Sequence, residues 1–218
     1  MGDTLTAALY AVLLAAGWVS SRAPGAPVGR SSVRPPWATL LALFVVGGTS
    51  LVQLAAAPDM LGALQRVPEE LENGQLWRLL TSLLVQDGGW SGAAFNLVAL
   101  AALGVTAERF WGFSRWWVVW LVAGVGAQFW GLLVQPTGGG NSVATFGLAA
   151  SLAVVAVLRG RGAARPAGAV CLLAGLIFFA GRDVYGGAAV LGAGTGLLLA
   201  RSGPAPVSRR ARRPSRGR

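Results

Sequence analysis

Apolar residues along this chain form seven long runs, separated by short segments rich in proline, glycine and charge. About 20 apolar residues are enough to cross the roughly 30 Å hydrocarbon core of a bilayer. In lipid, the backbone groups of such a run must bond within the segment, so each run predicts a helix. The pattern therefore predicts an all-α membrane protein with spans at residues 4–20, 37–57, 92–110, 115–134, 142–158, 167–181 and 184–200.

The composition supports this prediction and narrows the chemistry. Hydrophobic residues make up 54% of the 218-residue chain and charged residues only 12%, which excludes an ordinary soluble domain. One cysteine, Cys171, rules out an internal disulfide. The chain has no histidine, so it lacks the usual ligands of zinc and transition metals, and we expect neither metal nor cofactor.

Charge predicts the orientation of the spans. All 18 basic residues are arginines. If seven spans alternate, 15 arginines fall on one side, whereas Arg66, Arg78 and Arg182 fall on the other with seven of the eight acidic residues. The positive-inside rule makes the arginine-rich side cytoplasmic. The N-terminus is then outside and the C-terminus cytoplasmic, and an even number of spans would place the arginine clusters on conflicting sides.

The chain divides into three predicted regions. Residues 1–36 form an N-terminal transmembrane helix and a cytoplasmic linker, residues 37–201 form the main membrane domain, and residues 202–218 form an arginine-rich, disordered tail. The first run has Asp3 rather than basic residues before it, which favours a retained helix over a cleaved signal peptide, the open alternative. We expect the tail to contact anionic lipids at about 1 kcal/mol per charge. We expect no nucleic-acid partner, because no aromatic or folded module accompanies the arginines.

Three segments carry a family resemblance: GQLWRLLT from position 74, FNLVALAALGVTAERFWG from 95 and GGNSVATFGL from 139. In the second segment, Gly104, Glu108 and Gly112 follow Asn96 at intervals of eight, four and four residues. These segments resemble the rhomboid family of intramembrane serine proteases. That family has a Trp-Arg pair in its first long loop, a helix with a His-x-x-x-Asn motif, and a Gly-x-Ser-Gly motif where a later helix begins. The resemblance covers residues 37–201 and implies a six-helix bundle, to which the first run adds a seventh helix.

The resemblance also assigns site positions. It implies that Ser142 occupies the nucleophile position and Asn96 the oxyanion position. Gly92 stands where the family has a histidine donor, Tyr185 stands where it has the histidine base, and Val143 replaces a glycine. Considered alone, Ser142 could instead be a helix N-cap, and Asn96 could form an interhelical hydrogen bond.

Other positions have structural interpretations. Ala188, Gly192 and Gly196 share one helix face at four-residue steps, which predicts close packing against the helix that begins at Ser142. Glu108, near a membrane-embedded helix end, needs a partner, and Arg109 and Arg115 are the expected ones.

These substitutions predict a protein that has lost its protease chemistry. A phenol with a pKa near 10 is ionised in only about one part in a thousand at neutral pH, and the chain has no lysine to act instead. Loss of the base costs about 10⁴- to 10⁶-fold in rate, and loss of an oxyanion donor about 10²- to 10³-fold. We therefore expect a pseudoprotease that binds or retains transmembrane clients, which would enter between residues 92–110 and 167–181.

Two alternatives follow from the same sequence. The first is an active rhomboid protease that uses Ser142 with a non-histidine base, either water or Tyr185. The second is a transporter or channel, which the lack of charge pairs within the runs disfavours. Arginine as the sole basic residue, with abundant alanine and glycine, is typical of a GC-rich genome, and we expect a bacterial plasma membrane protein.

Overall fold

A computed structural model describes residues 3–22 and 35–202, which form seven long and three short helices and contain no strand. The long helices are α1 (Asp3–Arg22), α2 (Trp37–Ala55), α6 (Gly89–Trp111), α7 (Phe113–Val134), α8 (Ser142–Arg159), α9 (Ala164–Ala180) and α10 (Val184–Ser202). The short helices are α3 (Met60–Leu64), α4 (Pro68–Glu72) and α5 (Arg78–Thr81). Each of the seven predicted runs coincides with a long helix. The arginine tail after position 202 and most of the predicted linker lie outside the described residues.

Length and composition show which helices can span a membrane. Among the described residues, α2, α6, α7, α8 and α10 are long and apolar enough to do so. α9 and the segment Ala8–Arg22 of α1 are apolar but shorter. Large apolar side chains such as Phe44, Val98 and Leu133 are exposed on the outer faces of the bundle, where a bilayer would cover them. The prediction of an all-α membrane protein is confirmed.

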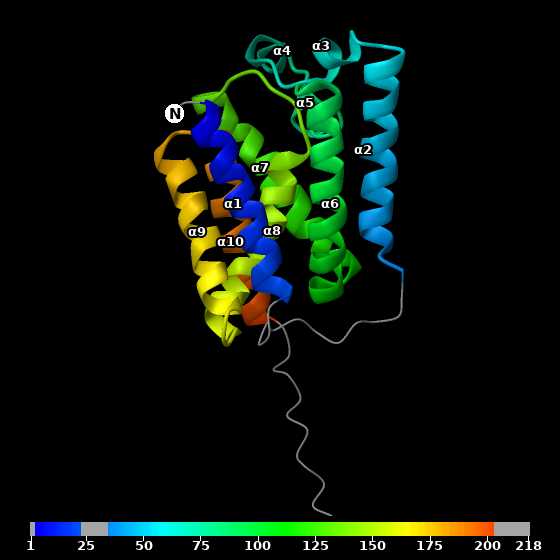
Figure 1. Cartoon of the computed structure of the whole chain (residues 1–218). Coiled ribbons are helices and arrows are strands. Elements are labelled where there is room, and N and C mark those ends of the chain that lie inside the picture. Colours follow the sequence, from blue (N-terminus) through cyan, green and yellow to red (C-terminus); the bar gives the residue numbers. More distant parts are fainter. Residues whose placement is uncertain (1–2, 23–34, 203–218) are drawn as a thin grey trace, which may run out of the picture.

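Helix α8 lies at the centre of the bundle, with 14 of its 18 residues buried. α7, α9 and α10 pack around it, and α1 and α6 also contact it (Figure 1). The contact with α10 is very close, because a Cβ added at Gly192 would lie 2.3 Å from the carbonyl oxygen of Gly147. A Cβ at Gly196 would lie 2.8 Å from Cα of Ser151. The predicted close packing of the small-residue face is confirmed.

Helix α2 stands at the edge of the bundle and packs mainly against α6. Glu108, one turn before the end of α6, accepts hydrogen bonds from the backbone N–H groups of Ala38 and Thr39 at 2.9 and 2.8 Å, and from the Thr39 hydroxyl at 2.8 Å. The expectation that Arg109 or Arg115 pairs with Glu108 is wrong. The first N–H groups of a helix lack intrahelical partners and favour a negative charge, so the start of α2 takes that role.

The segment between α2 and α6 folds over one end of the bundle through α3, α4 and α5 (Figure 1). Arg78 is buried and donates to the carbonyl oxygens of Gly62 at 2.7 Å and Gln65 at 3.1 Å, which holds this loop together. Its neighbour Trp77 is 56% exposed, as expected for a side chain at the membrane interface.

Candidate active site

Ser142 is the first residue of α8 and is buried, with 6% of its surface exposed. A glycine-rich turn leads into it. Within that turn Gly140 has a φ of +149°, and its N–H donates to the carbonyl oxygen of Ser82 at 2.7 Å. The interpretation of Ser142 as an N-cap is wrong, because α8 begins at Ser142 and Asn141 occupies the N-cap position. The Ser142 hydroxyl is therefore not engaged in capping the helix.

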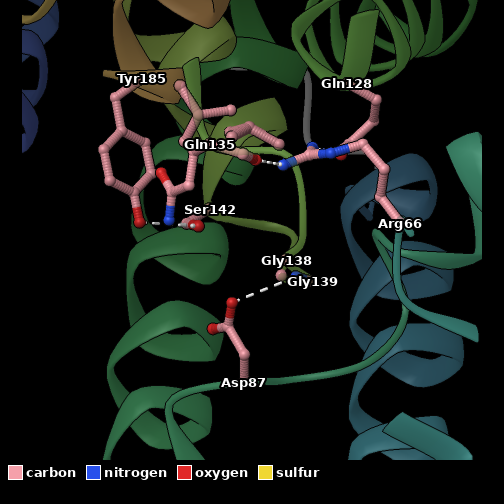
Figure 2. Close-up of a pocket in the computed structure, with 11 residues that line it drawn as sticks. Arg66, Asp87, Gln128, Gln135, Gly138, Gly139, Ser142 and Tyr185 are labelled. Carbon is pink, nitrogen blue, oxygen red and sulfur yellow. Dashed lines mark hydrogen bonds between the residues drawn. The ribbon is translucent and has the colours of Figure 1, made fainter. Parts of the chain in front are cut away.

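Tyr185 faces Ser142 from the first turn of α10 (Figure 2). The two hydroxyl oxygens are 3.4 Å apart, and either group can donate. Aromatic rings fix the position of the phenol: the Phe146 ring stacks on it at 4.5 Å between centroids, and the Phe178 and Tyr10 rings lie at 5.6 and 5.2 Å. The structure thus brings together, at one end of the bundle, the two residues to which the resemblance assigns the nucleophile and base positions.

The rings of Tyr10, Phe146 and Phe178 form an aromatic cage around Tyr185. Asp183 lies just before α10, two residues before Tyr185. Its Oδ1 accepts a hydrogen bond from the backbone N–H of Tyr185 at 3.0 Å. Burial raises the pKa of the Asp183 carboxyl above its ordinary value, and the bond from Tyr185 only partly offsets this effect. Its carboxylate is therefore used to cap α10 rather than to contact the Ser142 hydroxyl.

Asn96 lies on α6, and both ends of its amide are hydrogen-bonded. Tyr10 on α1 donates its hydroxyl to Oδ1 at 2.9 Å, and Nδ2 donates to Oε1 of Gln86 at 2.8 Å. Gln86 is buried and extends this hydrogen-bond network, because its Nε2 donates to Oδ1 of Asn141 at 3.0 Å. Its backbone also exchanges two 2.8 Å bonds with the Gln53 side chain. Asn96 thus forms the interhelical hydrogen bonds that the sequence left as an alternative.

Gly92 lies one helical turn before Asn96. A Cβ added at this position would meet no heavy atom within 4 Å. A side chain could therefore begin at this position without a clash at its Cβ.

A small pocket opens beside Ser142 and Tyr185, with a volume of about 40 Å³. Each water needs about 10–15 Å³ of such space, so the pocket has room for a few waters. Val143, which is 4% exposed, forms part of the wall. The β-branched side chain therefore stands at the approach to Ser142, where the family has glycine.

Two charged residues, Arg66 and Asp87, line the same pocket as Ser142 and Tyr185 (Figure 2). Arg66 is 2% exposed and donates to the Gln128 side chain and to the carbonyl oxygens of Gln135 and Pro136. Burial lowers the pKa of the Arg66 guanidinium to about 10, although Asp87 acts in the opposite direction, so Arg66 stays cationic at neutral pH. Asp87 accepts the N–H of Gly139 at 3.1 Å.

Sequence reasoning missed several residues that build this site. Tyr10, Gln53, Arg66 and Gln86 have no site role in the sequence analysis, although the structure places all four around the site. The sequence holds one signal for Tyr10, because the chain contains only one other tyrosine, Tyr185, which the resemblance already places in the site. Both of them lie in the aromatic cage, with ring centroids 5.2 Å apart.

The fold and the site define an integral membrane helix bundle with a serine at the start of its central helix, held against an amide network and a phenol. A family model for the rhomboid domain matches residues 73–202, so the chain belongs to the rhomboid family. The rhomboid protease GluP of Bacillus subtilis (strain 168) is 33% identical over 88 residues. That match covers 40% of this chain and 17% of the relative. No solved structure gives a significant match.

Proposed function

We propose that this protein is a rhomboid pseudoprotease, which binds the transmembrane segments of membrane-protein clients without cleaving them. The observation that carries the proposal is the hydroxyl pair of Ser142 and Tyr185 at 3.4 Å, in a chain without histidine. A serine nucleophile needs a base that removes its proton as it attacks. The phenol of Tyr185 is itself a proton donor at neutral pH.

The oxyanion side of the site supports the same conclusion. Gly92 offers no side-chain donor, and Gln86 already accepts one of the two Nδ2 hydrogens of Asn96. Each missing oxyanion donor costs about 10²- to 10³-fold in rate. With the base missing as well, the combined loss exceeds about 10⁶-fold if the two effects are even partly additive.

The proposal extends to the membrane context. We place the protein in a bacterial plasma membrane with its N-terminus outside and its C-terminus cytoplasmic, which the distribution of the 15 and three arginines supports. The arginine tail would then meet the anionic cytoplasmic leaflet. Ser142 begins α8 and Tyr185 lies in the first turn of α10, and we place the bound client segment on the lipid-facing side of this end of the bundle.

A second candidate function is active intramembrane proteolysis through Ser142. The sequence similarity to a rhomboid protease from Bacillus subtilis favours this second function. Ser142 and the carboxylate of Asp87 also line the same pocket, which favours it as well. In that case a water held in the pocket, or a transiently ionised Tyr185, would accept the serine proton.

A cleavage assay separates the two candidates. Wild-type protein, Ser142→Ala and the triple variant Gly92→His/Val143→Gly/Tyr185→His are reconstituted in liposomes with a fluorogenic transmembrane substrate. The proposal expects no turnover by the wild type, and turnover restored in the triple variant, because the Cβ of the histidine introduced in place of Gly92 enters open space. Wild-type turnover that disappears in Ser142→Ala would instead establish the protease. A quadruple variant that adds Ser142→Ala serves as the matched control for the restored activity.

A further inference from the structure

Helix α1 packs beside the candidate site, although it precedes the residues that match the family model. It packs mainly against α9 and α8 and also contacts α6. Figure 1 shows α1 crossing in front of α8, in the space between α6 and α9. This space is the client entrance expected from the sequence, so a segment of the protein's own chain occupies it.

One face of α1 is built for this position. Leu13 is fully buried and Leu14 nearly so, whereas Val12, Trp18 and Val19 on the other side are each at least 40% exposed. Gly17 lies where α1 packs tightly against α8 and α9. A Cβ there would stand 2.8 Å from Cβ of Ala149 on α8 and 3.4 Å from Sγ of Cys171 on α9.

The same face reaches the polar network of the site. Tyr10 lies seven residues before Gly17, so the two residues share a helix face. Its hydroxyl donates to Asn96 at 2.9 Å, and its ring centroid lies 4.5 Å from that of Phe146 and 5.2 Å from that of Tyr185. A helix from outside the matched domain therefore satisfies the amide at the oxyanion position and closes one side of the Ser142 site.

We propose that α1 is a built-in occupant of this space, and that a client's transmembrane helix takes its place against α8 between α6 and α9. This inference rests on the proposed function, that the protein binds transmembrane clients. The preferred client is a single apolar helix that copies the contacts of α1. It carries a hydroxyl or amide donor that reaches Asn96, and a glycine seven residues later that fits against Ala149. Such a client binds by displacing α1.

The first test weakens the seat of α1 in the full-length protein. Gly17→Leu places a large side chain where even a Cβ would lie 2.8 Å from Ala149, whereas the control Gly48→Leu lies on α2, where a Cβ meets nothing within 4 Å. Each protein is reconstituted in nanodiscs and titrated with a fluorescein-labelled peptide that has the sequence of residues 3–22. We expect Gly17→Leu to bind the peptide about tenfold more tightly than the wild type or the control, because fewer molecules have the surface occupied. A peptide carrying leucine in place of its own glycine should bind weakly to all of them.

The second test fixes α1 in place and does not depend on a destabilised variant. Gly17→Cys places a Cβ 3.4 Å from Sγ of Cys171, which is close enough for a disulfide with a small adjustment. Adding Ala149→Gly removes the atom that the new Cβ would meet at 2.8 Å. Oxidation should form the bond and lower peptide binding at least about tenfold, and reduction should restore it. The wild type, with its single cysteine, should respond to neither treatment.

The outcomes separate this inference from the proposed function. Equal peptide binding by the wild type, Gly17→Leu and the oxidised disulfide variant would show that clients dock elsewhere, which overturns the inference and leaves client binding in place. Absence of binding to every variant, for this peptide and for a panel of unrelated transmembrane peptides, would overturn both. Tighter binding by Gly17→Leu together with loss of binding in the disulfide variant would support both.

Discussion

The two ends of α6 differ in what has happened to the family motif. At one end, Glu108 is buried and accepts hydrogen bonds from three donors at the start of α2. Gly104 lies so close to Thr39 that a Cβ added at Gly104 would stand 2.8 Å from the Thr39 side chain. At the other end, Gly92 stands where the resemblance implies a histidine donor, and Asn96 bonds to Gln86 and Tyr10. The residues that hold the helices together match the family pattern, whereas at the other end Asn96 matches that pattern and Gly92 does not. Helix packing and the proposed loss of catalysis therefore concern opposite ends of one helix.

The largest effect is expected at the assembly end. Glu108→Ala leaves the buried N–H groups of Ala38 and Thr39 without partners, and each such group costs about 1–3 kcal/mol. We expect the variant to lose about 3–5 kcal/mol of unfolding free energy, measured by denaturant titration in mild detergent. The exposed Glu72 provides the control, since Glu72→Ala should change stability by less than about 0.5 kcal/mol. If the two variants behaved alike, the assembly role of Glu108 would be wrong.

A smaller effect is expected at the catalytic end. Asn96→Ala removes the acceptor of the Tyr10 hydroxyl and the donor to Gln86. Interhelical hydrogen bonds in membranes contribute about 0.5–2 kcal/mol, so we expect a loss in that range in the same titration. A loss as large as that of Glu108→Ala would remove the contrast between the two ends.

Gly92→His tests whether the start of α6 accepts a side chain at this position. An added Cβ at Gly92 meets no atom within 4 Å, so we expect a change in unfolding free energy below about 0.5 kcal/mol. Gly104→Ala, on the same helix, provides the contrast, because its Cβ would meet Thr39 at 2.8 Å and overpacking typically costs about 1–3 kcal/mol. Equal costs at the two glycines would argue against spare room at the donor position.

The smallest effect concerns pH. Burial raises the pKa of Asp183 in the folded state, so the folded protein binds this proton more strongly than the unfolded chain does. Its contribution to stability is fully present below the unfolded pKa and is lost as pH rises through the folded pKa. As pH rises through the folded-state pKa of Asp183, we expect the wild type to lose stability relative to Asp183→Asn. Thermal unfolding of both proteins at a series of pH values measures this difference. A difference that does not change with pH would contradict the assignment.

The sequence predicts the helices well because membrane spans depend on a local property, the length of an apolar run. The helix limits differ by a few residues, as at α6, which begins at Gly89 rather than at position 92. The spacing of small residues also predicts the contact between α8 and α10. The polar network could not be predicted, because it joins residues as far apart as Tyr10 and Asn96 or Gln53 and Gln86. Helix periodicity indicates which face is buried, but it does not indicate which distant side chain a buried amide will meet.

The aromatic cage also makes the site visible to spectroscopy. Tyr10 and Tyr185 are the only tyrosines in the chain, and their ring centroids are 5.2 Å apart. Protein produced with 3-fluorotyrosine would therefore give fluorine resonances from these two rings alone, one on each side of the contact between α1 and α10. Their chemical shifts and exchange broadening would report the seating of the N-terminal helix in a native bilayer, with no engineered label and no background signal from the rest of the molecule.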